Sequence, residues 1–209
     1  LGAKTSFHEW HGYGIQKRHG ESLCKNDWIF NVDADEEVLP SLRDAITQLF
    51  KENRFPHAAY RVKRIIVPPT RKGYFTFGPG DHFVRLYNKS LAEYSDSPIH
   101  DSVLLKDQNT SSIGTLKGQM LHYCFRSYTH MIEKINFYSS MQAEDMVKKG
   151  KRPSTLRLLI EPFYAFLKAY TLRRYFLLGL DGFVESVIYS FARTLRLAKA
   201  RELWKVQTR

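Results

Sequence analysis

The chain has 209 residues, a formal net charge of +11, 43% hydrophobic residues and 14% aromatic residues. This composition excludes a disordered protein and is enough for one sizeable core with an appended helical region. Two cysteines, Cys24 and Cys124, are too few for a disulfide framework and favour a reducing compartment. No apolar run reaches the roughly 18 residues that a membrane-spanning helix needs.

The positive charge is concentrated near the end of the sequence. Residues 151–209 contain 12 Lys and Arg against 4 Asp and Glu, in segments that are also rich in Leu, Phe and Tyr. Charge and apolarity occurring together favour an anionic membrane surface over a nucleic-acid groove. No RNA-binding motif accompanies the charge, so we expect no nucleic-acid partner.

The segment 27–37 is a short β-type run that leads directly into carboxylates. Trp28, Ile29 and Phe30 suit a buried strand, and Asp33 and Asp35 follow it as an Asp-x-Asp pair. Ligands collect at the carboxyl ends of strands in open α/β sheets, and hard cations take oxygen ligands. The pattern therefore indicates a site for a divalent cation and its phosphates. The alternative is a strand followed by an acidic helix start, with Pro40 in the first turn.

Residues 40–52 have the apolar spacing of an amphipathic helix, and residues 58–67 and 83–88 have strand patterns. In the second strand Arg85 points opposite to Val84 and Leu86. The loop 70–82 between the strands carries Tyr74, Phe75 and Phe77. These rings indicate either a lid over a ligand site or a hydrophobic plug against the core.

Three helices are expected in the last third of the chain. They run over 128–149, from about 154 with a kink or division at Pro162, and from about 182. Basic side chains beside the apolar face of the last helix would then face anionic headgroups: Arg193, Arg196, Lys199 and Arg201. The alternative is that these helices pack on the preceding part of the chain with solvated charges.

Several blocks of sequence, taken together, resemble the family 2, GT-A-type glycosyltransferases, specifically the branch that builds the lipopolysaccharide core. They fall in the order of that family, at similar spacing, over nearly the whole chain: Trp10 to Lys17, Asp27 to Glu36, Val84 to Tyr87, Pro98 to Asp101, Leu121 to Tyr123 and Arg126-Ser127.

The resemblance implies an α/β fold of GT-A type that lacks its first strands. The family's first strand and acidic nucleotide-binding motif would precede Leu1, so we expect this sequence to be the later part of a longer chain. Residues 1–126 would form the later part of the catalytic domain, and residues 127–209 a C-terminal amphipathic helical region that associates with membrane. The expected location is cytoplasmic, peripheral on the inner face of the cytoplasmic membrane.

The implied reaction is inverting transfer of a hexose from a nucleotide-sugar to a lipid-linked acceptor such as the lipopolysaccharide inner core. A uridine diphosphate sugar is the leading donor, and Mg²⁺ or Mn²⁺ the expected cofactor. Matching positions assign the donor to Asp33, Gln16, Lys17 and Arg85. The metal is assigned to Asp35 and, by position, to His122, for which a structural role is the alternative.

Inverting transfer needs a group that takes the proton of the acceptor hydroxyl. Related enzymes place a His-Glu or His-Asp step in this part of the chain, so Asp101 is the candidate base and His100 the second candidate. A turn-capping role is the alternative for Asp101. Two further functions stay open: transfer to another surface or lipid-linked glycan, and a non-catalytic, basic membrane-binding module.

Overall fold

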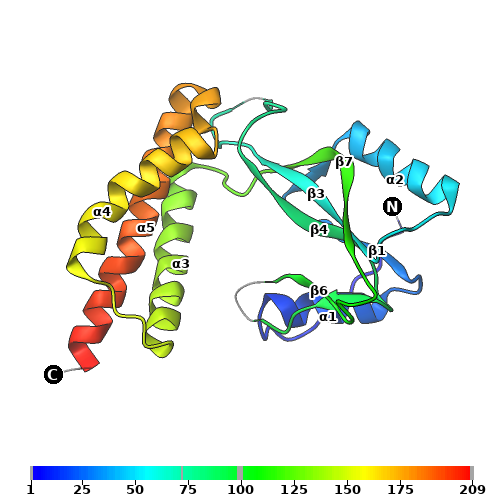
Figure 1. The fold of residues 1–209 in the computed structure, drawn as a ribbon, viewed down its shortest axis with the longest axis horizontal. Coiled ribbons are helices and arrows are strands. Elements are labelled where there is room, and N and C mark those ends of the chain that lie inside the picture. The colour runs from blue at the N-terminus through cyan, green and yellow to red at the C-terminus, as the bar shows by residue number, and fades with distance from the viewer. Residues whose placement is uncertain (1, 72, 98–100, 208–209) are drawn as a thin grey trace. The chain divides into compact units, whose positions relative to one another are not determined.

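The computed structural model describes residues 2–71, 73–97 and 101–207. Its contacts divide the chain into two compact units, one of residues 1–64 and 81–121 and the other of residues 65–80 and 122–209. The first unit is mixed α/β, as predicted, and the second is mostly helical (Figure 1).

The main sheet has five strands in the order β1-β4-β3-β7-β2, and β5 and β6 form a separate pair. Strands β1 and β4 are antiparallel, with Ile29 opposite Tyr87. The strands are β1 (Trp28–Phe30), β2 (Glu36–Val38), β3 (Ala59–Ile66), β4 (Gly80–Asn88), β5 (Ala92–Tyr94), β6 (Val103–Leu105) and β7 (Ile113–His122).

Both faces of this sheet are covered within the first unit (Figure 1). Helix α2 (Pro40–Glu52) packs Leu42 onto one face, against Val62, Leu86 and Met120. Pro40 lies in the first turn of this helix, where its missing N–H is not needed. Gly118, at φ 97°, is required here because a Cβ would meet the Leu42 backbone at 2.5 Å.

The opposite face of the sheet packs against the β5–β6 pair through residues such as Tyr87 and Tyr94. Helix α1 (Tyr13–Leu23) contacts β5 on that side. Because side chains alternate along β4, Leu86 joins the α2 face while Arg85 and Tyr87 lie on the α1 face. The predicted opposition of Arg85 and Leu86 therefore selects the face on which the polar site forms.

The second unit contains three long helices that lie side by side in Figure 1. They are α3 (Tyr128–Lys148), α4 (Thr155–Leu167) and α5 (Leu180–Gln207), with a π-helical turn η1 (Lys168–Leu172) and a 3₁₀ turn η2 (Tyr175–Leu178) after α4. Ser127 caps α3 by accepting from the His130 N–H at 3.1 Å. Helix α4 runs through Pro162 without the expected division.

The loop between β3 and β4 packs, within the second unit, on these helices. Phe75 joins the cluster of Ala169, Tyr175 and Leu178, and Thr70 donates to Asp181 at 2.9 Å. Phe75 is therefore a hydrophobic plug, whereas the ring of Phe77 stays exposed. None of the helices in the described ranges has both the length and the apolarity to cross a bilayer.

Helix α5 also buries a carboxylate, Glu185, whose side chain is 3% exposed. Its Oε1 has no hydrogen-bond partner among the described residues. Burial, followed by the charge of Asp181, raises the pKa of Glu185 from 4.5 to about 7. The folded protein therefore keeps a proton on this group that the unfolded chain releases.

This raised pKa predicts a loss of stability as the pH rises from about 4.5 to about 7, after which the loss is complete. We expect Glu185→Gln to remove that loss, which is at most about 3 kcal/mol. Urea denaturation at acidic and alkaline pH measures it. Glu202→Gln, an exposed position on the same helix, is the control and should keep the wild-type pH dependence. Equal pH dependence in wild type and Glu185→Gln would show that Glu185 ionises normally.

Candidate functional site

A cluster of ion pairs forms where β1 runs out into the turn before β2. Lys17 of α1 donates to Asn31 Oδ1 at 3.0 Å and pairs with Asp33 Oδ1. Arg85 of β4 reaches the same two residues from the other side, at 3.1 Å to Asn31 Oδ1 and 3.0 Å to Asp33 Oδ2. Both oxygens of Asp33 therefore face a cation.

Glu36 is the second carboxylate of this cluster. Its side chain is fully buried, and it accepts from the Asp33 N–H at 2.9 Å while pairing with Arg85 and, at 3.3 Å, with Arg64. The Arg64 guanidinium also lies 3.9 Å from the centre of the Phe83 ring. Three cations thus surround two carboxylates, which leaves the cluster with an excess positive charge.

Helix α1 is held close enough to contribute Lys17 by contacts at both of its ends. A Cβ on Gly14 would lie 1.9 Å from the Ser95 carbonyl oxygen, so only glycine allows this approach to the segment after β5. Further along the helix, Glu21 accepts from the Tyr87 hydroxyl at 2.8 Å and from the Tyr94 N–H at 3.0 Å. The glycine and the glutamate together fix the position of Lys17.

The cluster opens into a cavity of about 450 Å³ in the first unit. Asp33 and Arg85 line it, and so does Asp101, from the segment before β6. Its polar lining otherwise comes from Arg61, Arg64, His82, Tyr94 and Ser102. A cavity with this excess of cations suits a ligand that carries phosphates, and a carboxylate at its wall suits proton transfer.

The two carboxylates of the cavity differ in protonation chemistry. Burial alone would raise the pKa of Asp33, but the hydrogen bond from Lys17 and the charge of Arg85 hold it below its usual value. For Asp101, burial raises the pKa above 3.8; Lys17 opposes this shift and Asp33 adds to it. Asp33 is thus a fixed anion, whereas Asp101 holds a proton more readily than an ordinary carboxyl group.

The structure brings together three of the four predicted donor residues, Lys17, Asp33 and Arg85. Lys17 is largely buried, so it is not part of a solvated helix face. The fourth, Gln16, also lies on α1, and its Oε1 is buried without a hydrogen-bond partner among the described residues. The residue after Lys17, Arg18, forms an ion pair with Glu93 at 3.1 Å and is not part of the cluster.

The predicted catalytic and metal residues are placed less completely. Asp101 lines the cavity, whereas His100 lies outside the described residues. Asp35 lies in the turn between β1 and β2 of the first unit, and His122 ends β7 and belongs to the second unit. Asp35 is half-buried.

The acidic motif does not fit a metal ion in the way that its sequence suggests. Among the described residues no group of three His, Cys, Asp or Glu side chains could hold one. Asp33 and Glu36 are already neutralised by Lys17, Arg64 and Arg85. A cation held at this motif would therefore be coordinated by Asp35 and by oxygens of the ligand.

Sequence reasoning missed Asn31, Arg64 and His82 as site residues, and it assigned no role to Glu36. Asn31 and Glu36 flank the Asp-x-Asp pair, and a spacing of three residues lets Glu36 fold back onto the Asp33 N–H. Arg85 is a charged residue inside a strand, between Val84 and Leu86, and Arg64 lies inside a strand before Ile65 and Ile66. That pattern is a signal of paired burial that could have identified them.

Known proteins resemble this chain over most of its length. Two relatives named uncharacterized glycosyltransferase, from Rickettsia bellii and Rickettsia typhi, are 44% and 45% identical to it. Each alignment covers 97% of this chain, and 71% and 72% of the respective relatives. The lipopolysaccharide core biosynthesis glycosyltransferase LpsC of Rhizobium meliloti is 28% identical over 94% of this chain and 73% of its own length.

No model of a known protein family matches the chain. The Rickettsia relatives nevertheless establish its family, because a sequence identity above 40% extends over almost the whole chain and over more than two thirds of each relative. The chain belongs to the glycosyltransferases.

Proposed function

We propose that this glycosyltransferase is a GT-A enzyme that transfers a hexose, with inversion, from a uridine diphosphate sugar to a lipid-linked acceptor such as the lipopolysaccharide inner core. The name of LpsC supports the choice of acceptor. The observation that carries the proposal is the cavity lined by Asp33, Arg85 and Asp101, in which Asp33 is paired with both Arg85 and Lys17.

In this reaction the acceptor oxygen attacks the anomeric carbon of the sugar, and the bond from that carbon to the diphosphate oxygen breaks. Negative charge grows on the departing diphosphate, and Lys17 and Arg85 supply fixed positive charge beside it. Asp33 and Glu36 keep both cations in place before the donor arrives. Such prior organisation avoids rearrangement during the reaction.

Asp101 accepts the proton that the acceptor hydroxyl loses. Its raised pKa makes it a better base than an ordinary aspartate. Catalysis should therefore fail on the acid side when Asp101 is protonated, at a pH above the usual 3.8 of an aspartate.

Donor binding tests the cluster. We expect Lys17→Gln in the complete enzyme to weaken the binding of uridine diphosphate about 10- to 100-fold, because one charge-assisted hydrogen bond is lost. Isothermal titration calorimetry measures the effect. Lys25→Gln removes the same charge from an exposed position and should bind like wild type. If Lys17→Gln and Lys25→Gln bind equally, Lys17 does not contact the donor.

The divalent cation remains a prediction, with Asp35 as its protein ligand and His122 as a second candidate. We expect Asp35→Asn to abolish the binding of Mn²⁺, as measured by electron paramagnetic resonance in the presence of uridine diphosphate, while the thermal melt stays unchanged. Asp44→Asn, on the exposed side of α2, serves as the control. Normal Mn²⁺ binding by Asp35→Asn would eliminate Asp35 as a ligand.

The general base is tested by turnover. We expect Asp101→Asn to lower kcat by about 10²- to 10⁴-fold with little change in donor affinity, because the base acts on the acceptor proton. Asp107→Asn is the matched control: Asp107 is exposed and caps its turn by accepting from Asn109 N at 2.8 Å. Loss of turnover in His100→Ala together with an active Asp101→Asn would reassign the base to histidine.

A further inference from the structure

Helix α4 exposes its apolar side chains and buries a charged one, which is the reverse of an ordinary surface helix. Its buried positions are Glu161 and Ala165, whereas Leu159 and Phe163 are 64% and 73% exposed. The exposed apolar positions recur three and four residues apart and so form one stripe along the helix: Leu156, Leu159, Ile160, Phe163, Tyr164 and Leu167.

The inward side of α4 is held to α5 by polar contacts. Arg193 Nε donates to Glu161 Oε1 at 2.7 Å, and the Ser190 hydroxyl donates to the Pro162 carbonyl at 2.7 Å. The apolar stripe is therefore not needed to hold the two helices together. An exposed stripe of this length is uncommon unless another surface covers it.

Helix α5 continues the exposed apolar surface beside α4. Phe183, Val187 and Phe191 are about half exposed and lie four residues apart. The Phe166 and Phe183 rings meet edge to face at 5.6 Å, and a cavity of about 380 Å³ lies between Phe163 of α4 and Val187 of α5. We call these exposed side chains of α4 and α5 the α4–α5 face.

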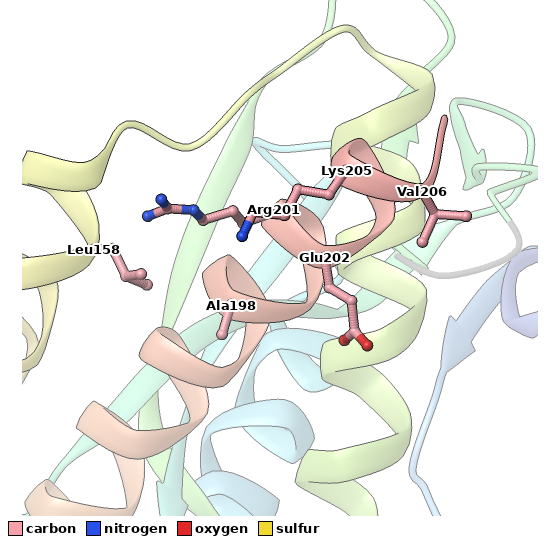
Figure 2. A pocket seen from close by; sticks show the side chains of 6 residues that line it. All are labelled: Leu158, Ala198, Arg201, Glu202, Lys205 and Val206. Carbon is pink, nitrogen blue, oxygen red and sulfur yellow. The ribbon is translucent and has the colours of Figure 1, made fainter. Parts of the chain in front are cut away.

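The same line of α5 becomes basic toward its end. Ala198, Arg201 and Lys205 follow at spacings of three and four residues, and with Leu158 of α4 they line a cavity of about 500 Å³. In Figure 2, Arg201 extends toward Leu158 and Lys205 extends in the same direction; Glu202 also lines this cavity, with its carboxylate pointing another way, so two basic side chains face one acidic one. We include Arg201 and Lys205 in the α4–α5 face, which is therefore apolar at one end and carries a net positive charge at the other.

Not all of the predicted basic side chains face outward. Arg193 pairs with Glu161, and Lys199 donates to Asn136 and to Ser139 of α3, so the expectation that these two would face headgroups is wrong. Their charges join the helices together. Arg201 and Lys205 are the basic residues of α5 that line the exposed cavity.

We propose that the α4–α5 face docks on an anionic phospholipid surface, with its aromatic and aliphatic side chains among the acyl chains and with Arg201 and Lys205 at the headgroup phosphates. Residues 151–209 carry 12 basic against 4 acidic side chains. This positive charge attracts anionic headgroups and repels the same region of a second copy, so it favours lipid as the partner. The inference rests on the proposed lipid-linked acceptor only for its biological purpose, since docking requires neither donor nor acceptor.

The test is sedimentation of the complete enzyme with phosphatidylcholine vesicles, with and without phosphatidylglycerol. We expect the enzyme to sediment with the anionic vesicles, less so at high salt, because the charge interaction is screened within about 8 Å at physiological ionic strength. The double variant Leu159→Gln with Phe163→Gln should bind the anionic vesicles at least about tenfold more weakly than wild type. The double variant Arg201→Gln with Lys205→Gln should lose at least as much affinity.

Matched controls separate docking from general effects. Phe137→Gln removes an exposed ring from α3, and Lys117→Gln with Lys148→Gln removes two exposed charges elsewhere. Both controls should bind vesicles like wild type. Circular dichroism melts establish that every variant is folded, and transfer to a water-soluble acceptor should be unchanged in the α4–α5 face variants.

Three results would overturn the proposal: no sedimentation with anionic vesicles at low salt, equal binding by the face variants and their controls, or a wild-type dimer that the face variants dissociate. The last result would assign the α4–α5 face to a second copy. Each leaves the proposed transfer reaction standing, because that reaction is measured without vesicles. Conversely, an inactive enzyme that still binds vesicles would refute the proposed function alone.

Discussion

The buried guanidinium of Arg85 is the constraint on which the first unit depends. A charge that is only 4% exposed must be matched, and Asp33 and Glu36 supply the opposite charge from the turn that joins β1 to β2. Removing one member of such a buried group commonly costs about 3–5 kcal/mol, because the remaining charge stays buried without a partner. The acidic motif, β4 and α1 therefore stay in one arrangement, which is also the arrangement that places cations at the cavity.

This arrangement changes the meaning of the Asp-x-Asp pair. The spacing of two carboxylates suggests a metal site, yet Asp33 serves as the anchor of Lys17 and Arg85. Fixed cations neutralise a leaving diphosphate by the same electrostatic principle that a divalent ion uses. In the second unit an ion pair also has a structural role, because Glu161 and Arg193 hold α4 and α5 together. The apolar side chains of α4 are then exposed to an external surface.

Much of the fold could be predicted from local pattern. The helix over 40–52, the strands around 58–67 and 83–88, and the three late helices follow from apolar spacing, and the structure confirms them within a few residues. The cluster itself could be predicted only in part, because Arg85 lies 52 residues from Asp33 and 49 residues from Glu36 along the chain. The alternation around Arg85 showed on which face it lies, but only the packing of α1 against β5 brings Lys17 to the same place. The sequence predicted an amphipathic helical region with apolar surface to spare, but it did not show which side chains of α4 are exposed, because periodicity gives the stripe and not the side that it faces.

In the proposed reaction, Lys17 and Arg85 receive the diphosphate of the donor. A crystal structure of the complete enzyme with uridine diphosphate tests it most directly. The account predicts phosphate oxygens within about 3 Å of Lys17 Nζ and of the Arg85 guanidinium, with Asp33 still bound to both cations. A diphosphate bound elsewhere, with neither cation in contact with it, would contradict the account.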